Sequence, residues 1–174
     1  MDSSSLNKHF YKFAYKFLVN RTQGIIDEKD IQSYLTVPDP EYCCESMNDV
    51  FRRMLFSAQN RQMSVNVIGG SIGGVENLSS VLNDFDVHFV SDKYSNKADI
   101  LLMDITKTFN LDGKIKTGAK SLWPQYCKTI VSIATFLSQF DDYAKMLQWI
   151  NTFYNDEKSM AALPLVISEE IFGF

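Results

Sequence analysis

The chain has 174 residues, of which 45% are hydrophobic and 22% charged, and its formal net charge is −4. These values are typical of one soluble globular domain with a sizeable core, and they exclude disordered and fibrous proteins. No apolar run approaches the roughly 20 residues of a membrane span, and the polar start MDSSSLNKHF predicts a cytoplasmic protein with no membrane partner.

The first two predicted helices come from apolar residues at three- and four-residue steps, the spacing of a one-sided helix. The first stripe runs through Leu6, Phe10, Phe13 and Phe17. The second stripe covers residues 47–58, behind a start at Pro40–Glu41, and consists of Met47, Val50, Phe51, Met54, Leu55 and Ala58. Both segments are expected to bury one face against the rest of the protein.

Residues 64–90 give a mixed signal. SVNVIGGSIGG combines β-branched residues with four glycines, and each interior glycine costs a helix about 1 kcal/mol relative to alanine. VENLSSVLNDF returns to helical spacing, and VHFVSDKY is a candidate short helix that Asp84 or Asp86 could cap. The conformation of the glycine-rich part, as loop or strand, stays open at this point.

A third helix is predicted over residues 98–109, with Ser95 or Asn96 placed to cap it. A long loop or hairpin-like excursion, NLDGKIKTGAK, follows. Its charges make residues 105–130 basic, because Asp112 alone opposes Lys107, Lys114, Lys116, Lys120 and Lys128. Such a segment can contact a phosphate backbone, although a solvated lysine-rich loop is the alternative.

Two further helices are predicted over residues 122–137 and 143–153, capped by Ser121 and Asp141. Beyond Asp141 the chain is acidic, which would suit a protein partner. Five segments of the same period predict an all-α fold: a single compact multi-helix domain over residues 1–174, with about seven or eight helices.

Metal and cofactor chemistry has little support in the composition. Two of the three cysteines are adjacent, Cys43 and Cys44, and form neither a CxxC pair nor a disulfide framework. His9 and His88 are the only histidines. Buried free thiols are therefore predicted, with no metal site and no cofactor. The aromatic residues at helical spacing are expected to pack in the core.

Two metal-dependent enzymes are open alternatives. GGS at residues 69–71 followed by DFDVHF matches the layout of polymerase β-like nucleotidyltransferases, in which Asp84 and Asp86 would hold Mg²⁺ from one strand. Asp99 or Asp104 would supply a third acid, although the segment that carries them repeats at helical spacing. A restriction-type nuclease would use Asp99 with the lysines of DGKIKTGAK.

A third interpretation starts from MLFSAQNRQMSVN, which resembles the LLSAQ helix end of the helix-hairpin-helix DNA glycosylases, the endonuclease III-like superfamily. DKYSNKADILLMDITKTF resembles that family's Y-x-x-K-A turn entering a helix. MAALPLVISEEIFGF falls where the family has its leucine–proline lead into the hairpin. The resemblance spans residues 49–174 and implies hydrolysis of an N-glycosidic bond on a base extruded from duplex DNA.

The resemblance also suggests nucleic-acid-binding residues. In this family the glutamine of SAQ lies near the gap left by the extruded base, which carries over to Gln59. Ser57 would brace the turn, and Asn60 or Arg61 would reach a phosphate or a base edge. The alternative is a polar helix C-terminus, where Arg61 interacts favourably with the helix dipole.

The family's hairpin, nucleophilic lysine and activating aspartate would follow EEIFGF, so no catalytic residue is assigned here. The expectation is a DNA-repair protein resembling a base-excision glycosylase, either the front part of a longer hydrolase or a shortened relative that does not cleave the bond. Duplex DNA is the expected partner, contacted also by Lys114, Lys116 and Lys120. The contrasting hypothesis is a non-catalytic helical module that binds a protein through its acidic C-terminal half.

Overall fold

The computed structural model describes residues 3–22, 25–35, 44–60, 66–154, 159 and 162–173, with the backbone alone described in 3–11 and 32–35. Where the sequence predicts one domain over residues 1–174, the contacts divide the chain into two compact units, Met1–Cys43 and Cys44–Phe174. The division arises because the helices of the smaller unit pack against each other, as described next.

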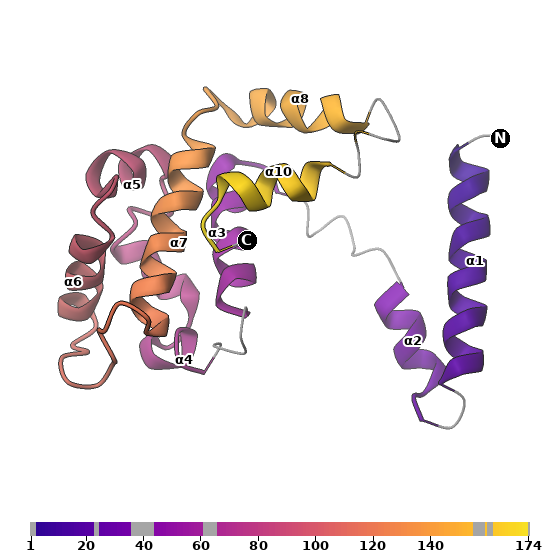
Figure 1. The fold of residues 1–174 in the computed structure, drawn as a ribbon, viewed down its shortest axis with the longest axis horizontal. Coiled ribbons are helices and arrows are strands. Elements are labelled where there is room, and N and C mark those ends of the chain that lie inside the picture. The colour runs from indigo at the N-terminus through magenta and orange to yellow at the C-terminus, as the bar shows by residue number, and fades with distance from the viewer. Residues whose placement is uncertain are drawn as a thin grey trace. The chain divides into compact units, whose positions relative to one another are not determined.

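The smaller unit contains a pair of helices, α1 (Ser3–Arg21) and α2 (Glu28–Leu35), which pack together (Figure 1). The Tyr15 hydroxyl on α1 donates a hydrogen bond to the Glu28 carboxylate at the start of α2. Ile31 on α2 is buried. The helix predicted from the stripe that ends at Phe17 is confirmed, but the predicted packing of Phe13 and Phe17 in the core is wrong, because both rings are exposed.

The regular elements described in the larger unit are all helices, with no strand among its described residues, so the all-α prediction is confirmed. Two of its helical segments are short, one of four residues in the glycine-rich link and one of six residues directly after it, and with them the described helices number ten, above the seven or eight expected. Its elements are α3 (Met47–Asn60), α4 (Gly69–Ile72), the 3-10 helix η3 (Val75–Ser80), α5 (Val87–Tyr94), α6 (Ala98–Thr108), α7 (Leu122–Leu137), α8 (Tyr143–Tyr154) and α10 (Leu163–Glu170).

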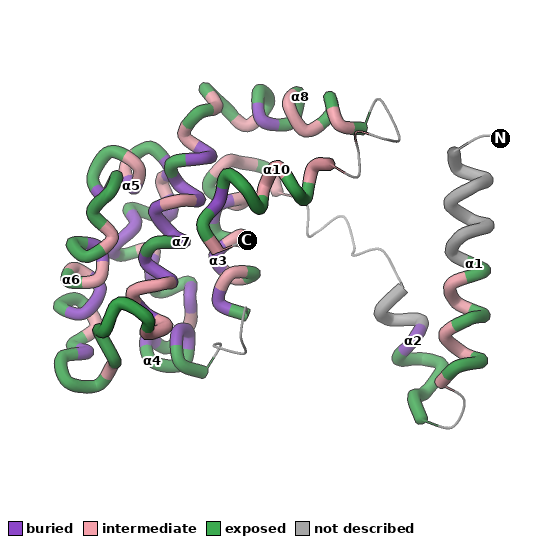
Figure 2. The backbone as a smooth tube through the Cα atoms, in the orientation of Figure 1, coloured by how far each residue is buried: buried purple, intermediate pink, exposed green. Residues whose placement is uncertain are grey.

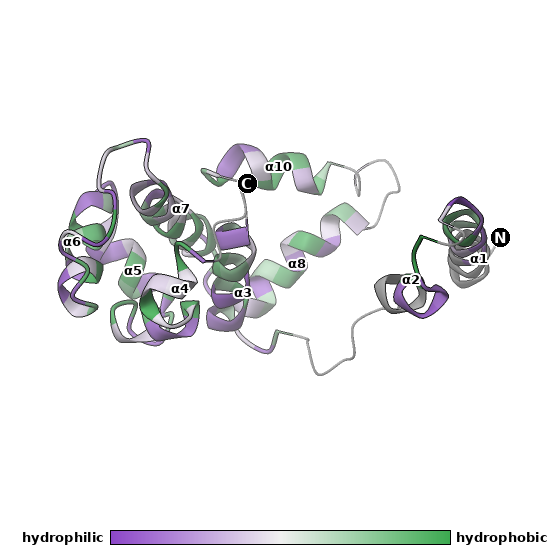
Figure 3. Cartoon of the chain, turned by 90° about the horizontal axis from the view of Figure 1, so that it is seen from below, coloured by the Kyte–Doolittle hydropathy of each residue, from purple (hydrophilic) through white to green (hydrophobic). Residues whose placement is uncertain are grey.

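Helix α7 is the central element of the larger unit. It packs against α5, α6 and α3, and lies between α6 and α3 in both views (Figures 1 and 3). A helix that is apolar around most of its circumference is stable only when it is surrounded, and α7 has buried residues on several sides (Figure 2). These are Trp123, Tyr126, Cys127, Thr129, Ile130, Val131, Ile133, Ala134, Phe136 and Leu137.

The described part of the link that the sequence left open, residues 66–74, forms short helical turns, and residues 64 and 65 lie outside the described residues. Gly73 (φ 78°) ends α4 in the left-handed region, and Gly74 (φ 130°) has a conformation that side-chain-bearing residues avoid. Its amide donates to the Gly69 carbonyl at 2.8 Å, which closes the turn. The glycines therefore allow the chain to reverse between α4 and η3.

Helix starts agree only in part with the predicted caps. Asp86 caps α5 and accepts a hydrogen bond from the Phe89 amide at 2.9 Å. Residue 97 rather than Ser95 or Asn96 precedes α6, because Asn96 (φ 56°) lies in a left-handed turn. Asp142, not Asp141, caps α8 and accepts from the Lys145 amide at 2.8 Å. Ser121 precedes α7, but its side chain makes no capping bond.

The two described cysteines, Cys44 and Cys127, differ in their burial. Cys127 is buried in the core, and burial raises the pKa of its thiol, so that it stays protonated at neutral pH. Cys44 is half-buried, and Cys43 lies outside the described residues. None of the described helices has the length and apolar composition needed to cross a membrane.

The turn from α5 into α6 is held by one polar cluster. The Tyr94 hydroxyl donates to Asp104 Oδ2 at 2.7 Å, and Lys93 Nζ lies 3.0 Å from the same oxygen. The Lys97 amide donates to the Tyr94 carbonyl at 2.8 Å, so residues 94–97 form a turn that leads into α6. The Tyr94 hydroxyl and the Lys93 ammonium lower the pKa of Asp104, because both stabilise its charged form.

Replacing Asp104 with asparagine should lower the free energy of unfolding at pH 7 by about 0.5 kcal/mol, since the pair is partly exposed to solvent. A folded pKa below the unfolded value adds stability above the unfolded pKa, and this contribution is lost as pH falls through the folded pKa. The difference between wild type and variant should therefore shrink in urea melts near pH 3. An unchanged difference at acid pH would contradict the assignment.

Candidate nucleic-acid interface

The polar end of α3 separates into exposed and buried residues. Ser57 and Asn60 are exposed, whereas Gln59 is only 5% exposed, and Arg61 lies outside the described residues. Gln59 follows Phe51 and Leu55 at four-residue steps, so it lies on the buried face of the helix. A residue that fills the gap of an extruded base must reach solvent, and in this structure Gln59 does not.

Gln59 packs instead against the glycine-rich turn. A Cβ atom built on Gly69 would lie 2.7 Å from Gln59 Oε1, closer than real side chains approach. Gly69 is itself buried, so glycine permits the close approach of α4 to the end of α3. Gln59 therefore contacts the α4 segment that follows it in the chain. The sequence did not predict this contact, because Gln59 was grouped with its polar neighbours at the end of α3.

A groove of about 640 Å³ brings the predicted lysines together beside this turn. We call it the lysine groove. Its described lining residues include three cations and no carboxylate, although the chain as a whole has a net charge of −4. They are Asn66, Val67, Ser71, Lys114, Ile115, Lys116, Lys120, Ser121, Leu122 and Trp123.

The lysines reach the groove because the loop after α6 is anchored by its apolar residues. Leu111 is buried, and its amide donates to the Thr106 carbonyl at 2.9 Å. Ile115 packs against the core, while Lys114 and Lys116 on either side of it are exposed. Within the described residues these lysines make no ion pair, so their charge is available to a ligand.

Trp123 forms part of the groove wall and belongs to the core at the same time. Its side chain is 1% exposed and meets the Tyr126 ring edge-on, with ring centroids 6.0 Å apart. The indole N–H has no hydrogen-bond partner in the described part of the chain. The Tyr126 hydroxyl donates to the Leu55 carbonyl at 3.0 Å and so ties α7 to α3. Trp123 therefore connects the groove wall, through Tyr126, to the packing of α7 on α3.

The aspartates of the transferase alternative have local structural roles. Asp84 is exposed in a left-handed turn (φ 53°), and Asp86 caps α5. The strand that would align the two carboxylates is absent, because residues 87–94 are helical. Asp104, a possible third acid, is bound to Tyr94 and Lys93. Among the described residues no three His, Cys, Asp or Glu side chains gather as metal ligands. The layout expected of a polymerase β-like enzyme is therefore not formed.

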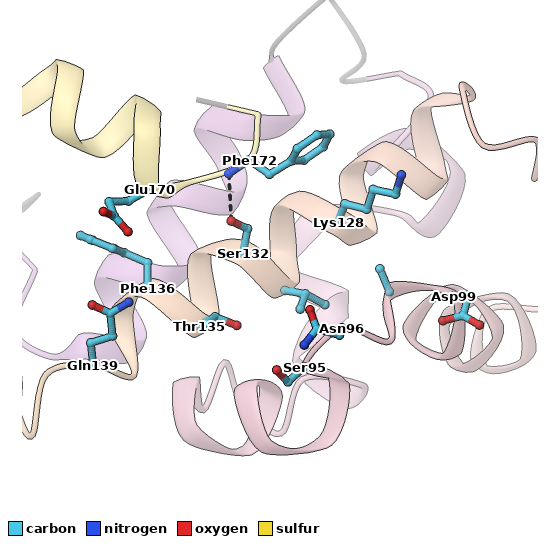
Figure 4. Close-up of a pocket in the computed structure, with 12 residues that line it drawn as sticks. Ser95, Asn96, Asp99, Lys128, Ser132, Thr135, Phe136, Gln139, Glu170 and Phe172 are labelled. Carbon is cyan, nitrogen blue, oxygen red and sulfur yellow. Dashed lines mark hydrogen bonds between the residues drawn. The ribbon is translucent and has the colours of Figure 1, made fainter.

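Asp99, the aspartate of the nuclease alternative, lies in the first turn of α6 and lines a second groove of about 640 Å³ (Figure 4). Lys128, Glu170 and Phe172 also line this second groove, so its charges are mixed. The Phe172 amide donates to Ser132 Oγ at 2.8 Å, which joins the end of α10 to α7. Asp99 thus lines a different groove from Lys114, Lys116 and Lys120, and the nuclease grouping is not formed.

The acidic C-terminal half is described in part. Its exposed carboxylates lie before α8 and at the end of α10. They are Asp141, Asp142, Glu169 and Glu170; Asp156 and Glu157 lie outside the described residues.

Comparison with known proteins identifies no relative: no family model, no curated protein and no solved structure matches the chain.

Proposed function

We propose that the larger unit binds duplex DNA, with the lysine groove as its phosphate contact. The observation that carries this proposal is the gathering of three unpaired lysines, with no carboxylate among the described lining residues, in an otherwise acidic protein. Lysines that neutralise phosphates release condensed counterions, which supplies most of the affinity of nonspecific binding. Asn66, Ser71 and Ser121 add uncharged polar groups on the same wall.

The resemblance to helix-hairpin-helix DNA glycosylases supports the same proposal. The all-α fold agrees with it, and Ser57 and Asn60 stay exposed at the end of α3. Residues 94–97 form the turn that the family's Y-x-x-K-A motif leads one to expect. The groove supplies cations and hydroxyls but no activating carboxylate among its described residues. The proposal is therefore that these residues bind DNA as in a glycosylase, and not that they cleave the glycosidic bond.

The test is a charge reversal of the groove, K114E/K116E/K120E. Each lysine that contacts a phosphate contributes about one to the slope of log affinity against log salt, so the slope should fall by about three. The loss should be similar for all duplex sequences, because phosphate contacts read no bases. The measurement is fluorescence anisotropy of a labelled duplex over a range of salt concentrations.

A matched control is K97E/K107E/K145E, which makes the same change in net charge at three exposed lysines of the larger unit that do not line the groove. This control should keep nearly the full salt slope, with a smaller general loss of affinity. Equal losses in both variants would point to overall charge rather than to the groove. If wild type shows no salt-dependent binding, the protein-binding module with its acidic face becomes the better hypothesis.

A further inference from the structure

Helix α1 carries a concentrated positive charge in an acidic protein. Its 19 residues include Lys8, Lys12, Lys16 and Arg21, and contain no aspartate or glutamate. The described cations among them, Lys12, Lys16 and Arg21, are exposed and form no ion pair with a described residue. This charge belongs to the smaller unit, whereas the lysine groove lies in the larger one.

The described part of α1 has two different sides. Ala14, Tyr15, Leu18 and Val19 are half-buried, and Tyr15 bonds to Glu28 at the start of α2. The side chains on the outward side are exposed, as expected from the 3.6-residue turn. Asn20 is one of them, and we call the other five the aromatic–basic face: Lys12, Phe13, Lys16, Phe17 and Arg21.

Two phenylalanines on this face contact water over much of their surface. Phe13 is 65% exposed and Phe17 is 52% exposed. Their rings are nearly parallel, with an interplanar angle of 19° and centroids 6.4 Å apart. The Arg21 guanidinium lies 5.8 Å from the centre of the Phe17 ring. Flat apolar rings therefore alternate with cations along one side of the helix.

We propose that the aromatic–basic face binds single-stranded nucleic acid. Proteins that bind unpaired strands combine cations that follow the phosphates with aromatic rings on which bases stack. Stacking tolerates any sequence because every base has a flat face. Phe13 and Phe17 supply the rings, and Lys12, Lys16 and Arg21 supply the charge.

A membrane surface fits this face less well. Helices that lie in a membrane interface bury a broad apolar side and place their cations on the opposite side. In α1 the cations share the outward side with the two rings, and the opposite side packs on α2. The described apolar strip on this side consists of two rings that follow each other along the helix, which suits stacked bases better than lipid chains.

The test measures binding of the full chain to a labelled oligothymidylate of about twenty nucleotides, longer than the site of a single binding domain. F13A/F17A should weaken binding roughly tenfold or more, because both stacking rings are lost. F13W/F17W should preserve or strengthen binding, since the larger rings stack at least as well. The matched control is I25A/I26A, which removes two exposed apolar side chains of the same unit outside α1 and should leave affinity unchanged.

Two further measurements separate this proposal from others. K114E/K116E/K120E should reduce duplex affinity and keep most of the affinity for the single strand, while F13A/F17A should do the reverse. Unchanged single-strand affinity in F13A/F17A would overturn the proposal. The proposal would also be overturned if wild type bound phosphatidylserine vesicles as tightly as the single strand and F13A/F17A abolished this vesicle binding. A lower melting temperature of F13A/F17A with unaltered single-strand affinity would show that the face packs within the protein, and would also overturn it.

Discussion

Replacing Trp123 with alanine is expected to lower the free energy of unfolding by about 3–5 kcal/mol. Trp123 is among the largest fully buried side chains, at 1% exposure, and it packs edge-on against Tyr126 at the start of α7. Alanine would leave a cavity beside the helix that α3, α5 and α6 all contact. Because most domains are stable by only about 5–15 kcal/mol, such a loss is a large fraction of the total.

A tryptophan-to-phenylalanine variant separates packing from polarity at this site. The Trp123 indole N–H has no partner among the described residues, so its removal sacrifices no internal hydrogen bond. W123F should therefore cost clearly less than W123A, about 1–2 kcal/mol for the smaller ring. Urea melts followed by circular dichroism would measure both, with shifted midpoints and similar slopes. Equal losses in the two variants would mean that the N–H makes a stabilising bond.

The fold class could be predicted because helical periodicity is a local property. The stripe that contains Met54 and Leu55 and the one that contains Ile130 and Leu137 both form helices in the structure. Single side chains decide the exact ends, however, and Asp142 caps α8 where Asp141 was expected. The glycine-rich link could not be assigned, because glycine itself permits loop, strand and turn alike.

The sequence predicted individual residues of the candidate site but not the groove that they form together. The three lysines stood out by charge, yet Asn66, Ser71 and Trp123, which share their groove, come from distant segments that only folding brings together. Gln59 was grouped with the exposed end of α3 because it is polar. Its four-residue spacing from Leu55 was the signal that it would be buried. The aromatic–basic face was visible as an apolar stripe, and only the structure shows that Phe13 and Phe17 stay exposed.

Phe51 provides the test of how α3 is held, and its replacement with alanine is expected to cost about 3–5 kcal/mol of unfolding free energy. The ring is fully buried and meets the Phe85 ring at 80°, with centroids 6.5 Å apart. Phe51→Leu keeps most of the volume and should cost less than about 1.5 kcal/mol. The neighbouring Arg52→Ala should be nearly neutral, because Arg52 is exposed and its contact with Asp49 is 4.0 Å long.

The same variant tests whether the interface depends on α3. Buried residues at four-residue steps, Phe51, Leu55 and Gln59, fix the rotation of α3 about its axis and so bring Gln59 against Gly69. F51A should therefore weaken duplex binding even at temperatures where it stays folded. The dependence of affinity on salt should persist, because the groove lysines lie between α6 and α7 and not on α3. An F51A protein with unchanged stability and affinity would mean that the apolar face does not hold α3, and the burial of Gln59 would then need a different cause.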